Sequence, residues 1–446
     1  MTELLFARAQ MAMLFAFHML FAVAGMGMPL LMTIAEWLHL RTGESVYREL
    51  ARRWSRGTAV LFAVGAVSGT MLSFELGLLW PRFMALAGGI IGLPFALEGF
   101  AFFAEAIFLG IYLYGWDRIS PAAHWLAGVV VSLGGLMSGI LVVTANAWMN
   151  SPAGFVLRDG VPEQVDPFAA MFNPAWKTET LHMTLAAYVA IGFAVAGIHA
   201  WCLLKDRENL FHRRALAIAL AVGCAAALLQ PLSGDLSARF VARDQPVKFA
   251  AMEGQFRTER GAPLRIGGIP DVAAGTTRYA IEIPRGLSLL AFHDPDAEVK
   301  GLDGVPPSDR PNPLPVHIAF QVMVACGSVM ALVSLVAAWR AWKRPGRFFD
   351  RRFLQAVAAA GPLGLVAVEA GWFVTETGRQ PWAVRGILRT SEAVTPVGGL
   401  AIPFAVITLV YLALGLSAAW LLRREVTGSL APTGNGDRAT PAPGPE

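Results

Sequence analysis

Several side chains that can bind iron lie inside segments that are otherwise apolar. His18 lies in the first such segment, His182 at the start of the fifth and Met323 in the seventh. Neutral imidazole and thioether sulfur are the axial ligands of six-coordinate b- and c-type haems. A single His or Met in a helix is more often a packed core residue, and the chain has 16 methionines. Taken one at a time, these residues leave haem ligation and core packing both open.

Four carboxylates form two pairs with the same spacing. Glu98 and Glu105 are seven residues apart in the third apolar segment, and Glu369 and Glu376 repeat that spacing in the eighth. Seven residues are about two helical turns, so each pair occupies one face of a helix. An ionisable group within a membrane-spanning helix is costly and therefore marks a candidate functional site. Haem ligation, proton relay and snorkelling at a helix end all remain open for these groups.

Two further motifs carry polar groups near a predicted membrane surface. GRQPW, at Gly378–Trp382, places Arg379 shortly after Glu376, where its guanidinium could bind haem propionates. A helix-ending turn is the structural alternative. KFAAME, at Lys248–Glu253, could hold a quinol head group and accept its proton, and a solvated charge pair is the alternative.

The elements that position these residues are predicted to be membrane-spanning helices. Of the 446 residues, 55% are hydrophobic and 15% charged, whereas a soluble domain carries about 25% charged residues. The apolar residues form blocks of about twenty or more, which can cross a hydrocarbon core roughly 30 Å thick. About nine spans are predicted, at 10–38, 58–79, 93–115, 122–147, 180–204, 214–233, 316–339, 353–375 and 398–422.

Lys and Arg gather in one set of the predicted connections. The segments that follow the first, third, fifth, seventh and ninth spans hold most of those outside the long connection 234–315. The positive-inside rule therefore predicts an N-terminus outside and a C-terminus in the cytoplasm. In this orientation the outer half of the membrane contains His18, Glu98, His182, Met323 and Glu376. Residues scattered for packing need not share one depth, whereas a redox cluster near the outer face would.

The spans and connections divide the chain into four predicted regions. Residues 1–233 hold six spans and 316–424 hold three. Between them, 234–315 is rich in Pro and charge and is predicted to be a functional extracytoplasmic loop. The last segment, 425–446, is predicted to be a disordered cytoplasmic tail.

Sequence strings over residues 1–425 resemble, in the same order, subunit I of cytochrome bd-type quinol oxidases. They are RAQMAMLFAFHMLF, EGFAFFAE with GWDR, ANAWMNSP, TLHMTLAAY, KFAAME, FQVMVACG and EAGWFVTETGRQPW. The resemblance implies an all-α bundle of two four-helix groups plus one peripheral helix. It also implies electrogenic, non-pumping catalysis, in which quinol is oxidised at the outer face and O₂ is reduced to water with protons from the cytoplasm.

The same resemblance implies a set of iron ligands. His182 and Met323 would be the axial pair of a low-spin b-type haem. His18 and Glu376 would each ligate one of two high-spin haems, of which one is b-type and the other d- or b-type.

Other roles implied by the resemblance concern the substrate and the haem surroundings. Lys248 and Glu253 would form part of the quinol site in the segment 234–315, which the family calls the Q-loop. Trp372 would lie between haems and Arg379 near propionates.

Proton supply and partners follow from the resemblance in the same way. Glu98 would lie close to the oxygen-reducing iron, and Glu105 and Asn146 would lie on a proton route. The partners would be subunit II, small single-span accessory subunits, ubiquinol or menaquinol, and O₂, without nucleic acid. The complex would lie in a bacterial cytoplasmic (inner) membrane.

Two features depart from well-known members, which carry Arg two residues before the ligand Met. Gln321 occupies that position here, and loss of a positive charge should make reduction of the low-spin haem less favourable. FELGLLW, at Phe74–Trp80, and a compact Q-loop resemble the cyanide-insensitive branch. A bc-type cytochrome b is disfavoured because the 8 histidines do not supply its two spaced His pairs. A secondary transporter with buried carboxylates is the non-redox alternative.

Overall fold

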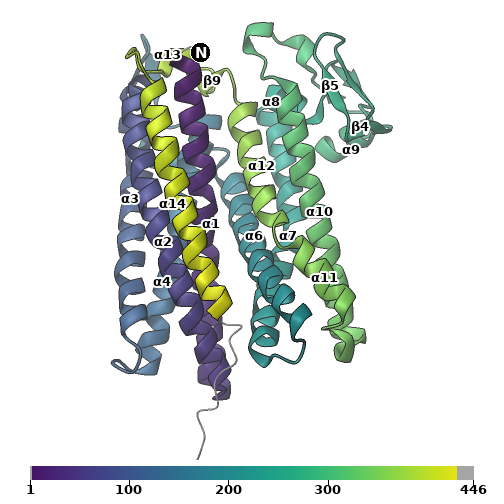
Figure 1. Ribbon diagram of the computed structural model, residues 1–446. Coiled ribbons are helices and arrows are strands. Elements are labelled where there is room, and N and C mark those ends of the chain that lie inside the picture. The colour runs from purple at the N-terminus through teal and green to yellow at the C-terminus, as the bar shows by residue number, and fades with distance from the viewer. Residues whose placement is uncertain (1–2, 429–446) are drawn as a thin grey trace, which may run out of the picture.

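A computed structural model describes residues 3–428 (Figure 1). Within that range, 9 helical segments are long and apolar enough to cross a membrane. They are α1 (Glu3–Thr42), α2 (Ser45–Leu79), α3 (Pro81–Tyr114), α4 (Pro121–Asn150), α6 (Trp176–Lys205), α7 (Leu210–Asp244), α10 (Pro313–Lys343), the consecutive pair α11 (Arg351–Ala360) and α12 (Leu363–Gly378), and α14 (Ala401–Gly428). The predicted number and order of spans are confirmed.

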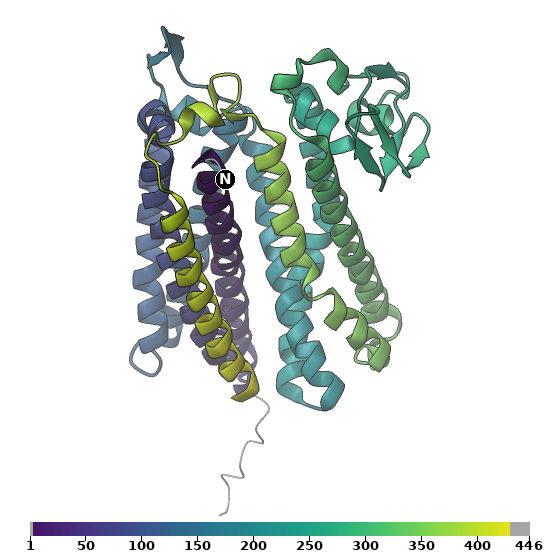
Figure 2. The same ribbon diagram turned by 45° about the horizontal axis from the view of Figure 1, so that its top comes forward.

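Short helices and two-stranded sheets cover the end of the bundle at which the chain begins (Figures 1 and 2). Before α6 lie β1 (Val156–Arg158), β2 (Val161–Glu163) and α5 (Pro167–Met171). The Q-loop contains α8 (Pro246–Glu253), β3 (Glu259–Arg260), β4 (Leu264–Ile266), β5 (Ile269–Asp271), β6 (Thr276–Arg278), β7 (Ile281–Ile283), α9 (Gly286–Phe292), β8 (Glu298–Val299), η1 (Leu302–Gly304) and η2 (Pro307–Asp309). After α12 come β9 (Trp382–Val384), β10 (Leu388–Arg389) and α13 (Thr390–Ala393). The antiparallel strand pairs are β1–β2, β3–β8, β4–β7, β5–β6 and β9–β10.

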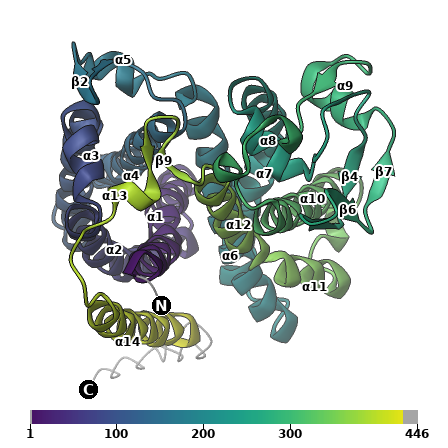
Figure 3. The same ribbon diagram turned by 90° about the horizontal axis from the view of Figure 1, so that it is seen from above.

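The spans form two packed groups, which Figure 3 shows from above. One group consists of α1 to α4, and the other of α6, α7, α10 and the pair α11–α12. The remaining span, α14, packs on the outside of α1 and α2. The predicted all-α bundle of two four-helix groups plus one peripheral helix is confirmed.

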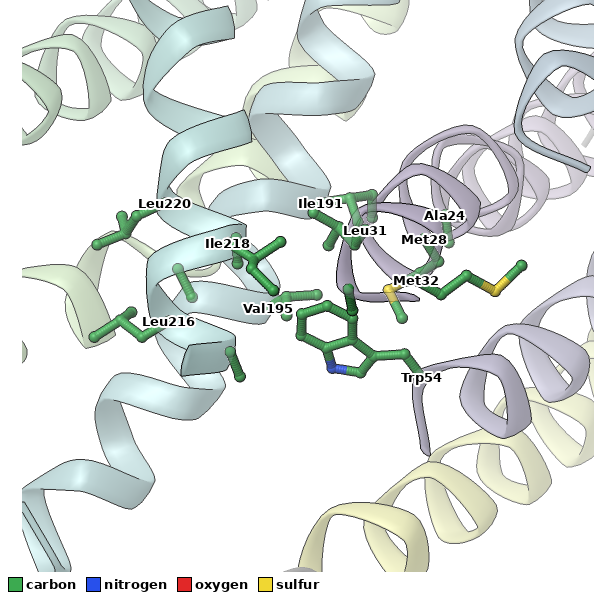
Figure 4. Packing of buried hydrophobic residues seen from close by; sticks show 14 of the residues in the cluster. Ala24, Met28, Leu31, Met32, Trp54, Ile191, Val195, Leu216, Ile218 and Leu220 are labelled. Atoms are coloured by element: carbon green, nitrogen blue, oxygen red, sulfur yellow. The ribbon is translucent and has the colours of Figure 1, made fainter. Parts of the chain in front are cut away.

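The largest buried cluster lies where the two groups meet (Figure 4). Met32 of α1 and Trp54 of α2 face Ile191 of α6 and residues of α7 across this interface. The helix backbones come close because Gly27 of α1 has no side chain: an added Cβ would lie 2.5 Å from the Cβ of Ile191. Tight contact between α1 and α6 therefore fixes how the two groups sit against each other.

Three boundaries differ from those predicted. Helix α7 does not end at 233 but continues to Asp244, with an ion pair between Asp235 and Arg239 in the extension. The eighth span is interrupted between α11 and α12 at Gly361–Pro362, where Pro supplies no backbone N–H. Helix α14 continues to Gly428, and the rest of the predicted tail, 429–446, lies outside the described residues.

Candidate functional site

Each of the two predicted histidine ligands is held by a serine from the helix that follows it in the chain. His18 Nδ1 lies 2.9 Å from the Ser68 Oγ of α2, and His182 Nδ1 lies 3.0 Å from the Ser233 Oγ of α7. Both serines are followed by glycine. A Cβ added to Gly69 would lie 2.9 Å from His18 Cε1, so the glycine makes room for that ring.

The hydrogen bonds of these serines determine which imidazole nitrogen carries the proton. Ser68 Oγ also donates to the Gly65 carbonyl at 3.1 Å, and Ser233 Oγ donates to the Gln230 carbonyl at 2.9 Å. Because the single hydroxyl proton is used there, each oxygen accepts from histidine Nδ1–H. The Nε2 atoms are then the lone-pair nitrogens, which is the tautomer required for a metal ligand.

Gln230 adds a second polar contact to His182. Its amide nitrogen lies 3.2 Å from the His182 carbonyl oxygen and 3.3 Å from both ring nitrogens. An iron atom at Nε2 would require this amide to keep only its carbonyl contact. The residues therefore fit a haem ligand after one side-chain adjustment.

Met323 of α10 faces α12, and Trp372 of α12 faces α1. A Cβ added to Gly371 would lie 2.9 Å from the Met323 sulfur, so a glycine of α12 makes room for the thioether. The neighbouring Trp372 packs against Phe15 of α1, with ring centroids 5.6 Å apart and the ring planes tilted by 43°. Its indole Nε1 is buried without a hydrogen-bond partner among the described residues. Trp372 thus lies between the two helical groups.

Glu376, near the C-terminal end of α12, has donors on both carboxylate oxygens. Asn146 Nδ2 of α4 donates to Oε1 at 2.5 Å, and Arg379 Nη2 donates to Oε2 at 2.6 Å. The Arg379 side chain is only 2% exposed, and its Nε and Nη1 have no partner in the part of the chain that is described. A buried guanidinium with unused donors is costly, and an anionic group such as a haem propionate would satisfy it.

The Asn150 amide connects this carboxylate to the Q-loop. Its Nδ2 lies 3.1 Å from Asn146 Oδ1 and 3.2 Å from Glu179 Oε1, and its Oδ1 accepts from Lys248 Nζ at 3.2 Å. Asn150 is fully buried, so these partners replace water completely. A continuous polar network therefore runs from α8 through α4 to α12, and α6 joins it one turn before His182.

Lys248 and Glu253 lie on different faces of α8. Five residues of helix separate their side chains by about 140°. Lys248 packs on Gly378 and bonds to Asn150, whereas Glu253 lies within the field of Arg265 from β4. The two groups therefore do not form one charge pair.

Burial favours the neutral form of both Lys248 and Glu253 and shifts the pKa of each. It raises the pKa of the Glu253 carboxyl to about 8, although the Arg265 guanidinium acts in the opposite direction. It lowers the pKa of the Lys248 ammonium to about 8, although the Glu179 carboxylate opposes the shift. Groups with such values can exchange protons near neutral pH.

A pocket of about 150 Å³ lies between α8 and the GRQPW turn. Polar side chains in its lining include Lys248, Arg379, Gln380 and Arg385, and Trp382 contributes an aromatic ring. A flat head group or a carboxylate would find cationic donors there.

The carboxylates of α3 face α4. Glu98 Oε1 accepts from Ser138 Oγ at 2.7 Å. Glu105 is 4% exposed and packs against Gly134 and Gly135, and its Oε1 has no hydrogen-bond partner among the described residues. The predicted shared face is confirmed, since both side chains turn to the same neighbouring helix.

Several residues of the site were not predicted from the sequence. Ser68 and Ser233 bond to the predicted histidine ligands, and Asn150 accepts from Lys248. Glu179 accepts from Asn150. Both serines belong to Ser-Gly dipeptides, but Ser138–Gly139 of α4 is another, so the dipeptide alone was a weak signal.

The nine candidate spans of the described residues and the buried polar side chains between them define a polytopic membrane protein. The sequence model of the family "Cytochrome bd terminal oxidase subunit I" matches residues 6–429. The chain therefore belongs to the cytochrome bd oxidase subunit I family. Such membership favours a redox role over the transporter and bc-type alternatives.

Individual relatives cover nearly the whole chain. It is 38% identical over 427 residues to the putative cytochrome bd menaquinol oxidase subunit I of Bacillus subtilis, covering 95% of this chain and 96% of that protein. It is 30% identical over 490 aligned positions to the cytochrome bd-II ubiquinol oxidase subunit 1 of Escherichia coli, covering 94% and 95%. The bd oxidase structure from Geobacillus thermodenitrificans matches with a TM-score of 0.90 and 39% identity, covering 95% and 98%.

The serine contact generates a spectroscopic prediction. In Ser233→Ala, His182 should lose the acceptor that orients its ring and fixes its tautomer. We expect the haem that His182 is predicted to ligate to be retained in part, with a shifted reduction potential and a broadened electron paramagnetic resonance signal. Ser237→Ala, one turn away on α7, is the control. Parental potential and signal in Ser233→Ala would show that the contact has no positioning role.

Proposed function

We propose that the chain is the haem-bearing subunit of a terminal quinol oxidase that oxidises quinol at the outer membrane face and reduces O₂ to water. The observation that carries this proposal is the matched serine support of His18 and His182, which leaves Nε2 of each ring unprotonated, in a member of the cytochrome bd family. Purified complex should give a pyridine haemochrome and consume O₂ in a quinol-dependent manner. A haem-free preparation that still folds would overturn the assignment.

Four side chains would hold the haem irons. His182 and Met323 would be the axial pair of a low-spin b-type haem, and His18 and Glu376 would each ligate a high-spin haem, of which one is b-type and the other d- or b-type. Bound haem would supply the redox-active iron that carries electrons and reacts with O₂. The chain itself would orient the ligands and compensate the propionate charge.

Arg379 and Trp372 would serve the haems without ligating iron. The unused donors of Arg379 support a contact with propionates. The place of Trp372 between the two helical groups supports a position between haems.

Lys248 and Glu253 would act on the quinol from different sides of α8. Oxidation of a quinol to a quinone releases two protons as its electrons leave, so the site needs acceptors. Glu253, in its carboxylate form, would take a hydroxyl proton, and Lys248, in its ammonium form, would donate a hydrogen bond to a quinol oxygen. The Q-loop would then be the extracytoplasmic quinol-binding region.

Proton uptake from the cytoplasm would pass along α3 and α4. Glu105 lies two turns from Glu98 on the face towards α4, and its unpartnered Oε1 supports a role in passing protons inward to the oxygen site. Asn146, bonded to Glu376, would order the end of the route. Charge separation would follow without a pump, because electrons enter from outside and protons from inside.

The chain would work with subunit II and small single-span accessory subunits, with ubiquinol or menaquinol as the electron donor. Its place would be the bacterial cytoplasmic membrane, with the N-terminus outside and the C-terminus in the cytoplasm. The clustering of Lys and Arg in one set of connections supports this orientation.

Met323→Leu tests the axial pair. Leu preserves approximate volume but has no lone pair, so packing should survive while the iron loses a ligand. We expect the α-band of the low-spin haem to disappear from the reduced spectrum while the high-spin haems are retained. Met330→Leu, a buried Met two turns further along α10, is the matched control. An unchanged α-band in Met323→Leu would make Met323 a packing residue.

The pH dependence of quinol oxidation tests the two α8 groups. Below pH about 8 the Glu253 carboxyl is mostly protonated and cannot accept, and above pH about 8 the Lys248 ammonium loses its charge. The rate should therefore rise and then fall, with its maximum near pH 8. Glu253→Gln should remove the rising limb and Lys248→Ala the falling limb, each slowing electron entry by about tenfold.

The dithionite-reduced spectrum should stay normal in both variants, because neither residue ligates iron. Parental rates of quinol oxidation in both variants would show that α8 does not form the quinol site.

Glu105→Gln tests the proton route. Gln keeps the shape and hydrogen-bonding capacity of Glu but cannot cycle a proton. We expect haem content and quinol-to-haem reduction to survive, while steady-state turnover falls about tenfold, since ~1.4 kcal/mol on the limiting barrier is tenfold in rate. The variant is reconstituted in liposomes, where O₂ consumption and membrane potential are followed together. Parental values of both would remove Glu105 from the route, and lost haem would make it structural.

A further inference from the structure

The outer end of α10 holds the Q-loop through a buried histidine. His317 is fully buried, with Nδ1 2.7 Å from the Met252 carbonyl oxygen and Nε2 3.0 Å from the Gly267 carbonyl oxygen. Met252 belongs to α8, and Gly267 lies in the turn between β4 and β5. Both partners are acceptors, so the cationic ring satisfies both contacts and the neutral ring only one. His317 thus ties two parts of the Q-loop to one helix.

Gln321, one turn further along α10, holds the same turn from its other side. Its Oε1 accepts from the Gly267 N–H at 3.0 Å, and its Nε2 donates to the Arg265 carbonyl at 3.1 Å. The turn itself requires glycine, since Gly267 has φ +66° and Gly268 has φ +95°. The Gly267 peptide is therefore bonded to α10 through both its N–H and its C=O.

These contacts hold the backbone beside Glu253 and the backbone of Arg265, whose charge acts on Glu253. Met252 directly precedes Glu253, so the bond from His317 fixes the end of α8 that carries this carboxyl. The bond from Gln321 fixes the backbone of Arg265, whose guanidinium acts on Glu253. Glu253 Oε2 is buried without a hydrogen-bond partner among the described residues. The positions of the groups around this oxygen therefore determine its electrostatic environment.

We propose that His317 and Gln321 are positioning residues that fix Glu253 and Arg265 relative to each other and to the helix that carries Met323. The proposal rests on the proposed role of Glu253 as the acceptor of a quinol proton. Well-known family members carry Arg at the position of Gln321, and the proposal gives the amide a role that does not depend on charge. The amide has both a donor and an acceptor, and the Q-loop backbone bonds to each.

Other charged groups around α8 have partners of their own. Asp244 of α7 pairs with Arg385, and Arg379, beyond α12, pairs with Glu376. Asp303 of η1 accepts from the Thr258 N–H and hydroxyl.

Two more groups complete these surroundings. Lys248 turns to the opposite face of α8, where it bonds to Asn150, and His317 faces Glu253 from α10 only through the backbone of Met252. Arg265 is thus the charged side chain of the described residues whose field acts on Glu253.

The Arg265 guanidinium has its own contacts with Glu282 and Gln255, so loss of Gln321 would displace the Arg265 backbone without freeing the side chain. That displacement has a defined consequence for Glu253. Burial raises the pKa of this carboxyl and Arg265 opposes the rise, so displacement of Arg265 away from it leaves the pKa higher still. At any pH below that value a smaller fraction of Glu253 is ionised. The rising limb of quinol oxidation should therefore move to higher pH.

Gln321→Leu in the purified complex tests the proposal, because Leu keeps the side-chain volume and removes both hydrogen bonds. We expect the rising limb to move up by roughly half a pH unit and the KM for quinol to increase about threefold. Backbone hydrogen exchange should increase across residues 264–278, while the dithionite-reduced spectrum stays parental. Ser328→Ala is the matched control, since it removes one α10 hydrogen bond that stays within the helix.

An unmoved limb with a parental KM in Gln321→Leu would overturn the proposal. Failure of the proposed function is recognised separately, because Glu253→Gln would then keep the parental pH profile. His317→Phe removes the contacts with the Met252 and Gly267 carbonyls and should also raise the KM for quinol. If that variant does not assemble, Gln321→Leu decides alone, since Gln321 is only half-buried and its loss leaves the core intact.

Discussion

A polar group inside this bundle can be satisfied only by another part of the chain or by a bound ligand, because the surrounding hydrocarbon offers no hydrogen bonds. Asn150 shows how strictly the constraint operates. Its fully buried amide bonds to Lys248 of α8, Glu179 of α6 and Asn146 of its own helix. Asn146 in turn bonds to Glu376 of α12. The charged site beside α8 is possible because such bridging groups replace the missing water.

The same constraint makes unsatisfied groups informative. Among the described residues, Arg379 keeps two buried donor nitrogens without a partner, and Trp372 keeps one. Donors left this way in a dry interior cost free energy unless something arrives to accept from them. The proposed haem would bring propionate acceptors to Arg379, which would link the helical packing to the redox chemistry of the family.

The sequence was sufficient for the number of spans, their order and the identity of the polar residues they carry. Long apolar blocks have few alternatives to membrane helices, and an ionisable residue such as Glu105 stands out against them. The resemblance added roles that spacing alone could not supply. Ser68 and Ser233 could not be predicted, since serine is common in helices and its importance appears only when a particular histidine faces it.

The sequence also could not predict how side chains that are close along the chain are oriented relative to each other. Lys248 and Glu253 are close in the sequence, yet α8 turns them apart, and only knowledge that this stretch is helical reveals it. The contact between Gln321 and Gly267 joins residues 54 positions apart through a backbone N–H, which leaves no mark in side-chain chemistry. Such contacts depend on tertiary placement and not on local pattern.

The distances along the chain between bonded partners also bear on the order of assembly. His18 and Ser68 are 50 residues apart and His182 and Ser233 are 51, and each pair lies on consecutive helices joined by a short turn. Asn146 and Glu376 are 230 residues apart. Contacts local in the sequence close with less loss of chain entropy. Each imidazole–hydroxyl unit is therefore complete once its hairpin has entered the bilayer, whereas the carboxylate site must wait for nearly the last helix to be synthesised.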